Sequence, residues 1–146
     1  MEFQAILAEF GQATGLGDLA LDAEGTLSLL FDDTIELHFV HDKKDNAVML
    51  YSVLGSCVHL KNIESWQSLL RVSLLGAETG GASFGLHGDS IILWKRYDSF
   101  AYSIDLEQAV NTMLAQTEHW SARLALFEEA PINPSGEGFV MAGLKV

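Results

Sequence analysis

The first residues of the chain carry hydrophobic side chains at helical spacing. Phe3, Ile6, Leu7 and Phe10 fall at positions i, i+3, i+4 and i+7, the spacing that lines up one face of an α-helix. Glycines follow shortly afterwards in "GQATGLG" and can end the helix. The chain is therefore predicted to begin with an amphipathic helix.

The pattern then changes to short segments with a period of two. Residues 19–22, 26–31 and 35–41 are predicted to be three short strands, separated by the turn sequences "DAEG" and "DDT". In the last of them hydrophobic and mainly polar residues alternate. One face of that strand would be buried, and the other would mostly face water.

The following segment, 47–55, is hydrophobic on both faces of a predicted strand. The two sets are Val48, Leu50 and Leu54 on one face and Met49, Tyr51 and Val53 on the opposite face. A strand of this kind needs a packing partner on each side.

A second helix is predicted to begin after Asn62, a residue type that caps helix N-termini, and to continue to Gly76. Its hydrophobic residues form two stripes, Ile63, Trp66, Leu70 and Leu74 on one and Leu69, Val72 and Leu75 on the other. This much hydrophobic surface on a short helix predicts burial on two sides, which a small domain can achieve by dimerising around the helix.

A hairpin is predicted next, formed by "SFGLH" and "SIILWKRYD", joined through "GD" and with "SFAYS" as a candidate extension. Trp94 shares a strand face with Ile92, opposite Ile91 and Leu93. That second face needs cover from a helix, a subunit or a bound chain.

The last predicted helix begins with Asp105 and Gln108, which fit a capping box. Its hydrophobic side consists of Leu106, Val110, Met113, Leu114, Trp120, Leu124 and Phe127. Pro131 and Pro134 are expected to stop the helix. Residues 131–146 would then be a C-terminal tail.

This order of elements predicts an α+β fold, α-β-β-β-α-β-β-α, in which three helices pack against a twisted antiparallel sheet. Residues 1–130 would form one domain, and the doubly hydrophobic middle helix favours a homodimer of it.

Composition narrows the classes of partner. Eight Lys and Arg against 20 Asp and Glu give a formal charge of −12 without a dense basic run, which disfavours nucleic acid and anionic membranes. Hydrophobic runs are shorter than the ~20 residues that a membrane span needs. Cys57 is the only cysteine and the start "MEFQAILAEF" is unlike a signal peptide, so we expect a reducing cytoplasm.

Residues that could carry out chemistry are scattered along the chain. His38 and His41 lie on opposite strand faces, and Cys57 with His59 is too small a set for a metal ion. Ser90 lies in a hairpin turn without a nucleophile elbow. We therefore expect no catalytic residue, no metal and no cofactor.

Asp32 and Asp33 are adjacent residues of a turn. Side chains in this position point apart and face water, so their protonation states would hardly diverge. Turn formation accounts for both of them.

The order of these segments resembles the class I chaperones of bacterial type III secretion, the CesT/SycE-like family. The resemblance rests on "LALDAEGTLSLLFDDTIELHF", on the helix "NIESWQSLLRVSLLG", on the strand "SIILWKRYD" and on the long last helix with "EHW". It implies an α+β homodimer without enzymatic activity. It also implies a cytoplasmic protein that binds the extended N-terminal chaperone-binding segment of a secreted effector.

The resemblance also suggests which residues meet each partner. The expected dimer interface consists of Ile63, Trp66, Leu70, Leu74 and Trp94. The expected effector-binding residues are Phe3, Leu7, Phe10, Leu30 and Phe31. Ordinary core packing is the alternative for both sets. Regulatory members of the family bind an anti-activator protein instead of an effector, which is a further candidate partner.

Two other classes of protein remain open at this stage. An acidic immunity or inhibitor protein of a basic toxin would use carboxylates such as Asp32, Asp33, Asp42 and Asp45. A small hydrolase or ligand-binding domain would need a pocket with convergent polar groups.

Overall fold

The computed structural model describes residues 2–58 and 60–129, with side chains as far as residue 126. The helices are α1 (Phe3–Thr14), α2 (Ile63–Val72), the 3₁₀ helix η1 (Leu74–Gly76) and α3 (Ser103–Glu129). The strands are β1 (Thr26–Phe31), β2 (Ile35–Asp42), β3 (Ala47–Ser56), β4 (Ser83–His87) and β5 (Ser90–Tyr97). The predicted α+β order is confirmed.

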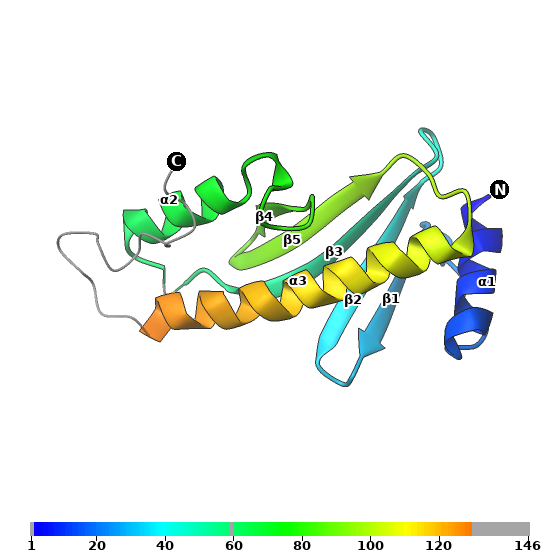
Figure 1. Cartoon of the computed structure of the whole chain (residues 1–146), viewed down its shortest axis with the longest axis horizontal. Coiled ribbons are helices and arrows are strands. Elements are labelled where there is room, and N and C mark those ends of the chain that lie inside the picture. Colours follow the sequence, from blue (N-terminus) through cyan, green and yellow to red (C-terminus); the bar gives the residue numbers. More distant parts are fainter. Residues whose placement is uncertain (1, 59, 130–146) are drawn as a thin grey trace.

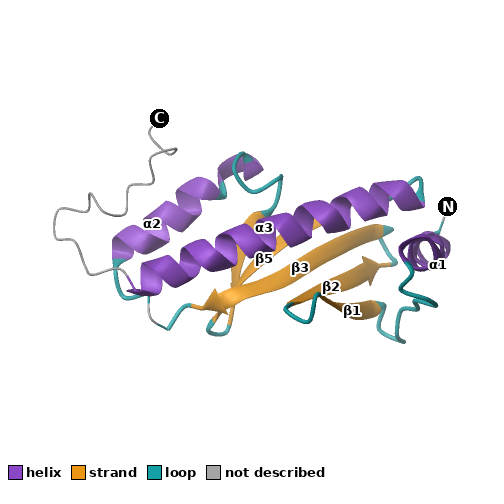
Figure 2. Cartoon of the chain, turned by 60° about the horizontal axis from the view of Figure 1, so that its bottom comes forward, coloured by secondary structure: helices purple, strands orange, loops and turns teal. Residues whose placement is uncertain are grey.

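The five strands form one antiparallel sheet in the order β1-β2-β3-β5-β4. The long helix α3 runs along one face of this twisted sheet, while α1 and α2 lie toward opposite ends of it (Figure 1). In Figure 2 the strands lie on one side of α3 and α2 lies beside the C-terminal half of that helix. The fold is therefore two layers, with one face of the sheet covered by helix.

The core lies between α3 and this covered face. From the sheet it receives Leu37, Leu50 and Leu93, and from α3 it receives Leu106 and Met113, all of them at most 1% exposed. These residues have the alternating and helical spacings expected from the sequence. Periodicity thus predicted the main core correctly.

One polar contact crosses this core. The hydroxyls of Ser52 on β3 and Thr117 on α3 are hydrogen-bonded at 2.6 Å, and Thr117 also donates to the Met113 carbonyl. Both side chains are buried, so each hydroxyl gives the other a hydrogen-bond partner where water is excluded.

The pairing of β3 with β5 is irregular at one place, between Val53 and Gly55.

The helix α1 closes one end of the molecule with its hydrophobic stripe turned inward. Gly15 ends it in a left-handed conformation, with φ of 75°, as the glycines of the sequence predicted. The predicted strand at 19–22 is wrong. The Gln4 side chain donates to the Leu19 carbonyl and accepts from the Leu21 N–H, and so occupies backbone groups that strand pairing would use.

The helix α2 begins as predicted but ends early. Asn62 accepts a hydrogen bond from the Glu64 N–H at 3.0 Å, which confirms the N-terminal cap. The helix stops at Val72 and is followed by η1, in which Leu75 has a φ of 57°. The continuous helix to Gly76 is therefore wrong, because the chain turns out of helical geometry at Leu75.

The start of α3 also differs from the prediction. The helix begins at Ser103, and Asp105 in its first turn accepts a hydrogen bond from the Tyr102 N–H at 3.2 Å. Asp105 therefore reaches back to the residue before the helix instead of being the first cap itself. The extension "SFAYS" is not part of the sheet, since β5 ends at Tyr97.

Two further expectations concern the ends of the chain and the membrane. Pro131, Pro134 and the tail 131–146 lie outside the described residues. Among the helices that the structure describes, none has both the length and the hydrophobicity needed to cross a membrane.

Candidate functional site

None of the described helices lies over the face of the sheet opposite α3 (Figure 2). The strand registers place Ser28, His38, Tyr51 and Trp94 in one row across this face, because paired residues of antiparallel strands point to the same side. We call this surface the open face. It carries the second set of hydrophobic residues that the sequence placed on 47–55 and on the Trp94 strand.

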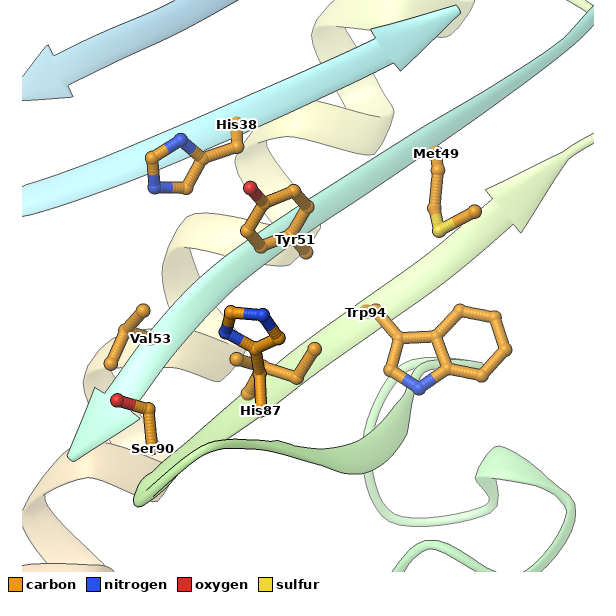
Figure 3. A pocket seen from close by; sticks show the side chains of 8 residues that line it. His38, Met49, Tyr51, Val53, His87, Ser90 and Trp94 are labelled. Carbon is orange, nitrogen blue, oxygen red and sulfur yellow. The ribbon is translucent and has the colours of Figure 1, made fainter. Parts of the chain in front are cut away.

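A hollow of about 490 Å³ lies on the open face. It is lined by His38, Met49, Tyr51, Val53, His87, Ser90, Ile92 and Trp94. Figure 3 shows the Tyr51 and His38 rings side by side, with Trp94 and Met49 at another part of the hollow and Ser90 beside Val53. The hollow therefore draws its side chains from four strands of the sheet.

The aromatic part of this hollow is held in place by neighbouring groups. The rings of His38 and Tyr51 are stacked with their centroids 4.5 Å apart. The Ser28 hydroxyl and His38 Nδ1 are hydrogen-bonded at 2.7 Å, and Glu36 lies 4.0 Å from His38 Nε2. Contacts of this kind fix the orientation of a ring before anything binds to it.

The chemistry of the hollow suits hydrophobic contact better than catalysis. No Lys, Arg, Asp or Glu lines it. Burial raises the pKa of the Tyr97 phenol, and a hydrogen bond from the Thr26 hydroxyl lowers the pKa of the Asp22 carboxyl, but neither residue belongs to the hollow. In the part of the chain that the structure describes, no group of His, Cys, Asp and Glu could hold a metal ion.

The strand β1 forms one free edge of the sheet. The Gly25 carbonyl accepts from His41 of β2, whereas the Thr26 carbonyl accepts from Asp22 on the outer side. Because the direction alternates along a strand, the backbone N–H and C=O groups of Ser28 and Leu30 also point outward. This edge can therefore accept the backbone of a further strand.

The residues predicted for the dimer interface fall into three environments. Ile63, Leu70 and Leu74 are exposed by 70%, 69% and 65%. Trp66 packs partly against the core and donates from Nε1 to the Leu60 carbonyl at 3.0 Å. Trp94 lies on the open face and lines its hollow, so this set does not form one surface within the chain.

The second stripe of α2 is only partly buried. Leu69 and Val72 belong to the core, as a stripe facing the domain requires. Leu75, which the sequence pattern placed with them, is 93% exposed. That assignment is wrong, because the helix has already ended when the chain reaches Leu75.

The residues predicted to bind an effector also separate. Phe3, Leu7 and Phe10 are at most 3% exposed and belong to the core. Leu30 is 59% exposed on the open face, whereas Phe31 points to the α3 side and is half-buried. The alternative of core packing thus describes the three residues of α1, and Leu30 offers the most surface of this set.

The other candidates from the sequence have structural roles. Asp32 and Asp33 form the β1–β2 turn with φ of 52° and 57°. Asp42 and Asp45 lie 3.7 and 3.4 Å from Arg96. Of the four carboxylates proposed for binding a basic toxin, those of Asp42 and Asp45 are therefore paired within the chain.

Cys57 and Ser90 complete these candidates. Cys57 is free, half-buried and lies just beyond β3, while His59 is outside the described residues. Ser90 begins β5 after the predicted hairpin turn.

Most residues of the hollow were not singled out from the sequence. Tyr51 and Met49 were recognised only as a second hydrophobic face, and His38 and Ser90 only as isolated polar residues. The signal was the alternation of Met49, Tyr51 and Val53, combined with a helix count too small to cover both faces. His87 gave no signal of its own.

Comparison with known proteins places this geometry in a family. No curated protein resembles the sequence closely enough to count as a match. The structure is similar to a chain of the HopA1-SchA chaperone-effector complex, with a TM-score of 0.71, 18% identity and coverage of 82% of this chain and 93% of the other. It is also similar to a chain of the ExsC-ExsE complex, with a TM-score of 0.72, 22% identity and coverage of 84% and 96%.

A third similar structure is the Yersinia pestis type III secretion chaperone SycH in complex with a fragment of YscM2. Its TM-score is 0.64 at 15% identity, with 80% of this chain and 98% of the other covered. At such identities these likenesses establish the fold. The model of the Tir chaperone protein (CesT) family, however, matches residues 5–121, most of the sequence. The chain belongs to the Tir chaperone protein (CesT) family, as its sequence resemblance predicted.

Proposed function

We propose that this protein is a class I chaperone of type III secretion that binds the extended N-terminal segment of a secreted effector and keeps it soluble. The observation that carries the proposal is the open face, a hydrophobic sheet surface with a hollow of about 490 Å³ that none of the described helices covers. Contiguous exposed hydrophobic surface of this kind marks an interaction site. Membership of a chaperone family supports the same conclusion.

The effector segment would use two separate features of the sheet. One part of its backbone would pair with the outward groups of Ser28 and Leu30 on β1, and another part would cross the open face and place hydrophobic side chains in the hollow beside Tyr51 and Trp94. Strand addition supplies affinity through main-chain hydrogen bonds, and pockets supply specificity. Within the predicted effector-binding set, we assign this role to Leu30 and treat Phe3, Leu7 and Phe10 as the core that supports it.

The protein would act as a homodimer formed through α2. Ile63, Leu70 and Leu74 present hydrophobic side chains that the described part of the chain leaves exposed. A two-fold contact would bury the stripe of one copy against that of the other. We keep these three residues and Trp66 as the proposed interface and move Trp94 to the effector site.

A pull-down from the source organism with the tagged protein tests the function, followed by limited proteolysis and sizing of the complex. We expect a dimer that protects an N-terminal fragment of a secreted protein. Trp94→Asp should lose this fragment, whereas Ile104→Ser, at an exposed position at the start of α3, should keep it.

Salt and partner structure separate the alternatives. Binding of a hydrophobic segment should depend weakly on salt, whereas an inhibitor of a basic toxin should lose affinity steeply as salt rises. Capture of a compact folded partner by a monomer would contradict the chaperone proposal.

A further inference from the structure

The loop that follows α2 is fixed to the rest of the domain. The buried Thr79 hydroxyl donates to the Ala82 carbonyl, and Lys95 Nζ of β5 donates to the Gly80 carbonyl at 3.1 Å. A Cβ on Gly80 would lie 2.9 Å from the Thr112 side chain of α3. The loop is therefore held closely against both the sheet and the long helix.

The tip of this loop turns through two consecutive left-handed residues. Leu75 has φ of 57° and ψ of 13°, and Gly76 has φ of 68°. The Gly81 N–H closes the turn on the Gly76 carbonyl at 2.9 Å, and a Cβ on Gly76 would lie 2.5 Å from the Gly81 Cα. Glycine suits this geometry, but leucine is one of the residues that it strains.

Leu75 is unfavourable in a second way. Its side chain is 93% exposed, the most exposed of the large hydrophobic side chains in the described part of the chain. A residue such as Asn would tolerate the left-handed conformation and would suit water better. Strained residues persist where the surrounding structure fixes them, and such residues are common at functional sites.

We propose that Leu75 is an anchor of the contact between two copies of this chain, presented by a loop that is rigid before the copies meet. This inference rests on the proposed dimer. Leu75 directly follows Leu74 in the chain and, like Ile63, Leu70 and Leu74, leaves its hydrophobic side chain exposed. A hydrophobic side chain carried by a fixed backbone loses little backbone freedom on binding, which is how preorganised anchors contribute affinity.

Charge identifies the second copy as the occupant. Residues 60–104, which include α2, the loop, β4 and β5, contain four Lys or Arg and four Asp or Glu and are formally neutral. The net charge of −12 therefore lies entirely in the rest of the chain. Two copies repel each other least when they meet through this neutral region.

The test replaces Leu75 with Asn and measures two quantities. Sedimentation of wild type and Leu75→Asn over a range of concentrations gives the dimer dissociation constant. We expect at least about a tenfold rise, the effect of losing an interface anchor. Ile104→Asn, the same kind of change at an exposed residue of α3 without positive φ, should leave the constant unchanged.

The second quantity is the melting temperature of a monomer. In a Leu70→Asp background, Leu75→Asn should raise Tm by about 2 °C because the strain and the exposed side chain are removed. The substitution is thus expected to weaken association and stabilise the monomer. A lower Tm for this double variant would overturn the argument from strain.

Other outcomes show which of the proposals is wrong. If Leu75→Asn dimerises like the wild type, Leu75 is not an anchor, although the proposed dimer stands. If the dimer is unchanged but the effector fragment is lost, the second copy is the wrong occupant. A wild-type protein that is monomeric at all concentrations would contradict the proposed dimer itself.

Discussion

The helices α1 and α2 are both amphipathic in sequence but present opposite surfaces in the structure. Phe3, Leu7 and Phe10 of α1 are buried against the domain, whereas Ile63 and Leu70 of α2 project into solvent. The buried side of α2 is instead its other stripe, with Leu69 and Val72. A helix with one hydrophobic stripe can be satisfied within its own domain, but a helix with two is left with one exposed.

This difference separates stability from association. Substitutions in the α1 stripe should affect folding, and substitutions in the exposed α2 stripe should affect the contact with another chain. Effects on free energy of unfolding and on oligomeric state can be measured independently, so each helix can be tested against the other.

The largest expected effect comes from a charge placed in each stripe. Leu7→Asp should destabilise the fold by about 5 kcal/mol or more, because a carboxylate would be buried without a partner. Leu70→Asp should change the stability of the monomer by only about 0.5 kcal/mol but abolish the dimer. Urea denaturation and light scattering of the two variants decide this. A folded Leu7→Asp protein would show that α1 is not an essential part of the core.

A smaller effect is expected from the close fit at the end of α1. A Cβ on Gly11 would lie 2.2 Å from the Gly17 carbonyl oxygen and 3.0 Å from Leu19 Cγ. Gly11→Ala should therefore cost about 2 kcal/mol of unfolding free energy, despite the better helix propensity of alanine. Gln108→Ala, at an exposed position of α3 outside the proposed interface, is the control and should be neutral. Denaturant midpoints provide the comparison, and a stabilised Gly11→Ala would contradict the fit.

The helix N-termini should differ by about 1 kcal/mol. Asn62 caps α2 through the Glu64 N–H, whereas Glu2 makes no side-chain cap on α1. Asn62→Ala should therefore lower the unfolding free energy by about 1 kcal/mol, and Glu2→Ala should leave it unchanged. Thermal melts followed by circular dichroism measure both. If Asn62→Ala and Glu2→Ala lower the unfolding free energy equally, Glu2 does contribute to the N-terminus of α1, and burial of the helix is not what stabilises that end.

The smallest effect concerns acid stability at the connection between α1 and β1. Hydrogen bonds from the Thr26 hydroxyl and backbone lower the pKa of Asp22 from 3.8 in the folded state. A lowered folded pKa contributes stability above the unfolded pKa, and this contribution is lost as the pH falls through the folded value. Asp22→Asn should therefore show a weaker loss of stability below about pH 4 than the wild type.

Asp98→Asn, at an exposed position after β5, is the matched control for acid stability. Its unfolding free energy should follow that of the wild type between about pH 2 and about pH 5, the range in which carboxyl groups titrate. If the curve for Asp22→Asn coincides with those of the wild type and Asp98→Asn, Asp22 does not contribute to acid stability.

Local patterns predicted much of this fold and less of its surfaces. The spacing of Leu37, Leu50 and Leu106 identified core positions because burial imposes a period on sequence. Periodicity cannot say whether a hydrophobic face is covered by the same chain or by another, so Phe10 was proposed for an effector with core packing as the alternative, and Leu75 was grouped with Leu69 and Val72 on one helical stripe. The side chain of Gln4 replaced a predicted strand through contacts 15 and 17 residues away, which no local pattern contains.

The length of α3 sets a scale for the partner. A helix of 27 residues extends about 40 Å, and α1 and α2 lie toward its opposite ends (Figure 1). In a dimer joined through α2, the two β1 edges would be separated by up to about twice that length. An extended chain covers about 3.3 Å per residue, so a segment that pairs with both edges needs about 25 residues between its two contacts. Shorter segments would occupy one half of the dimer and leave the other free for a second molecule.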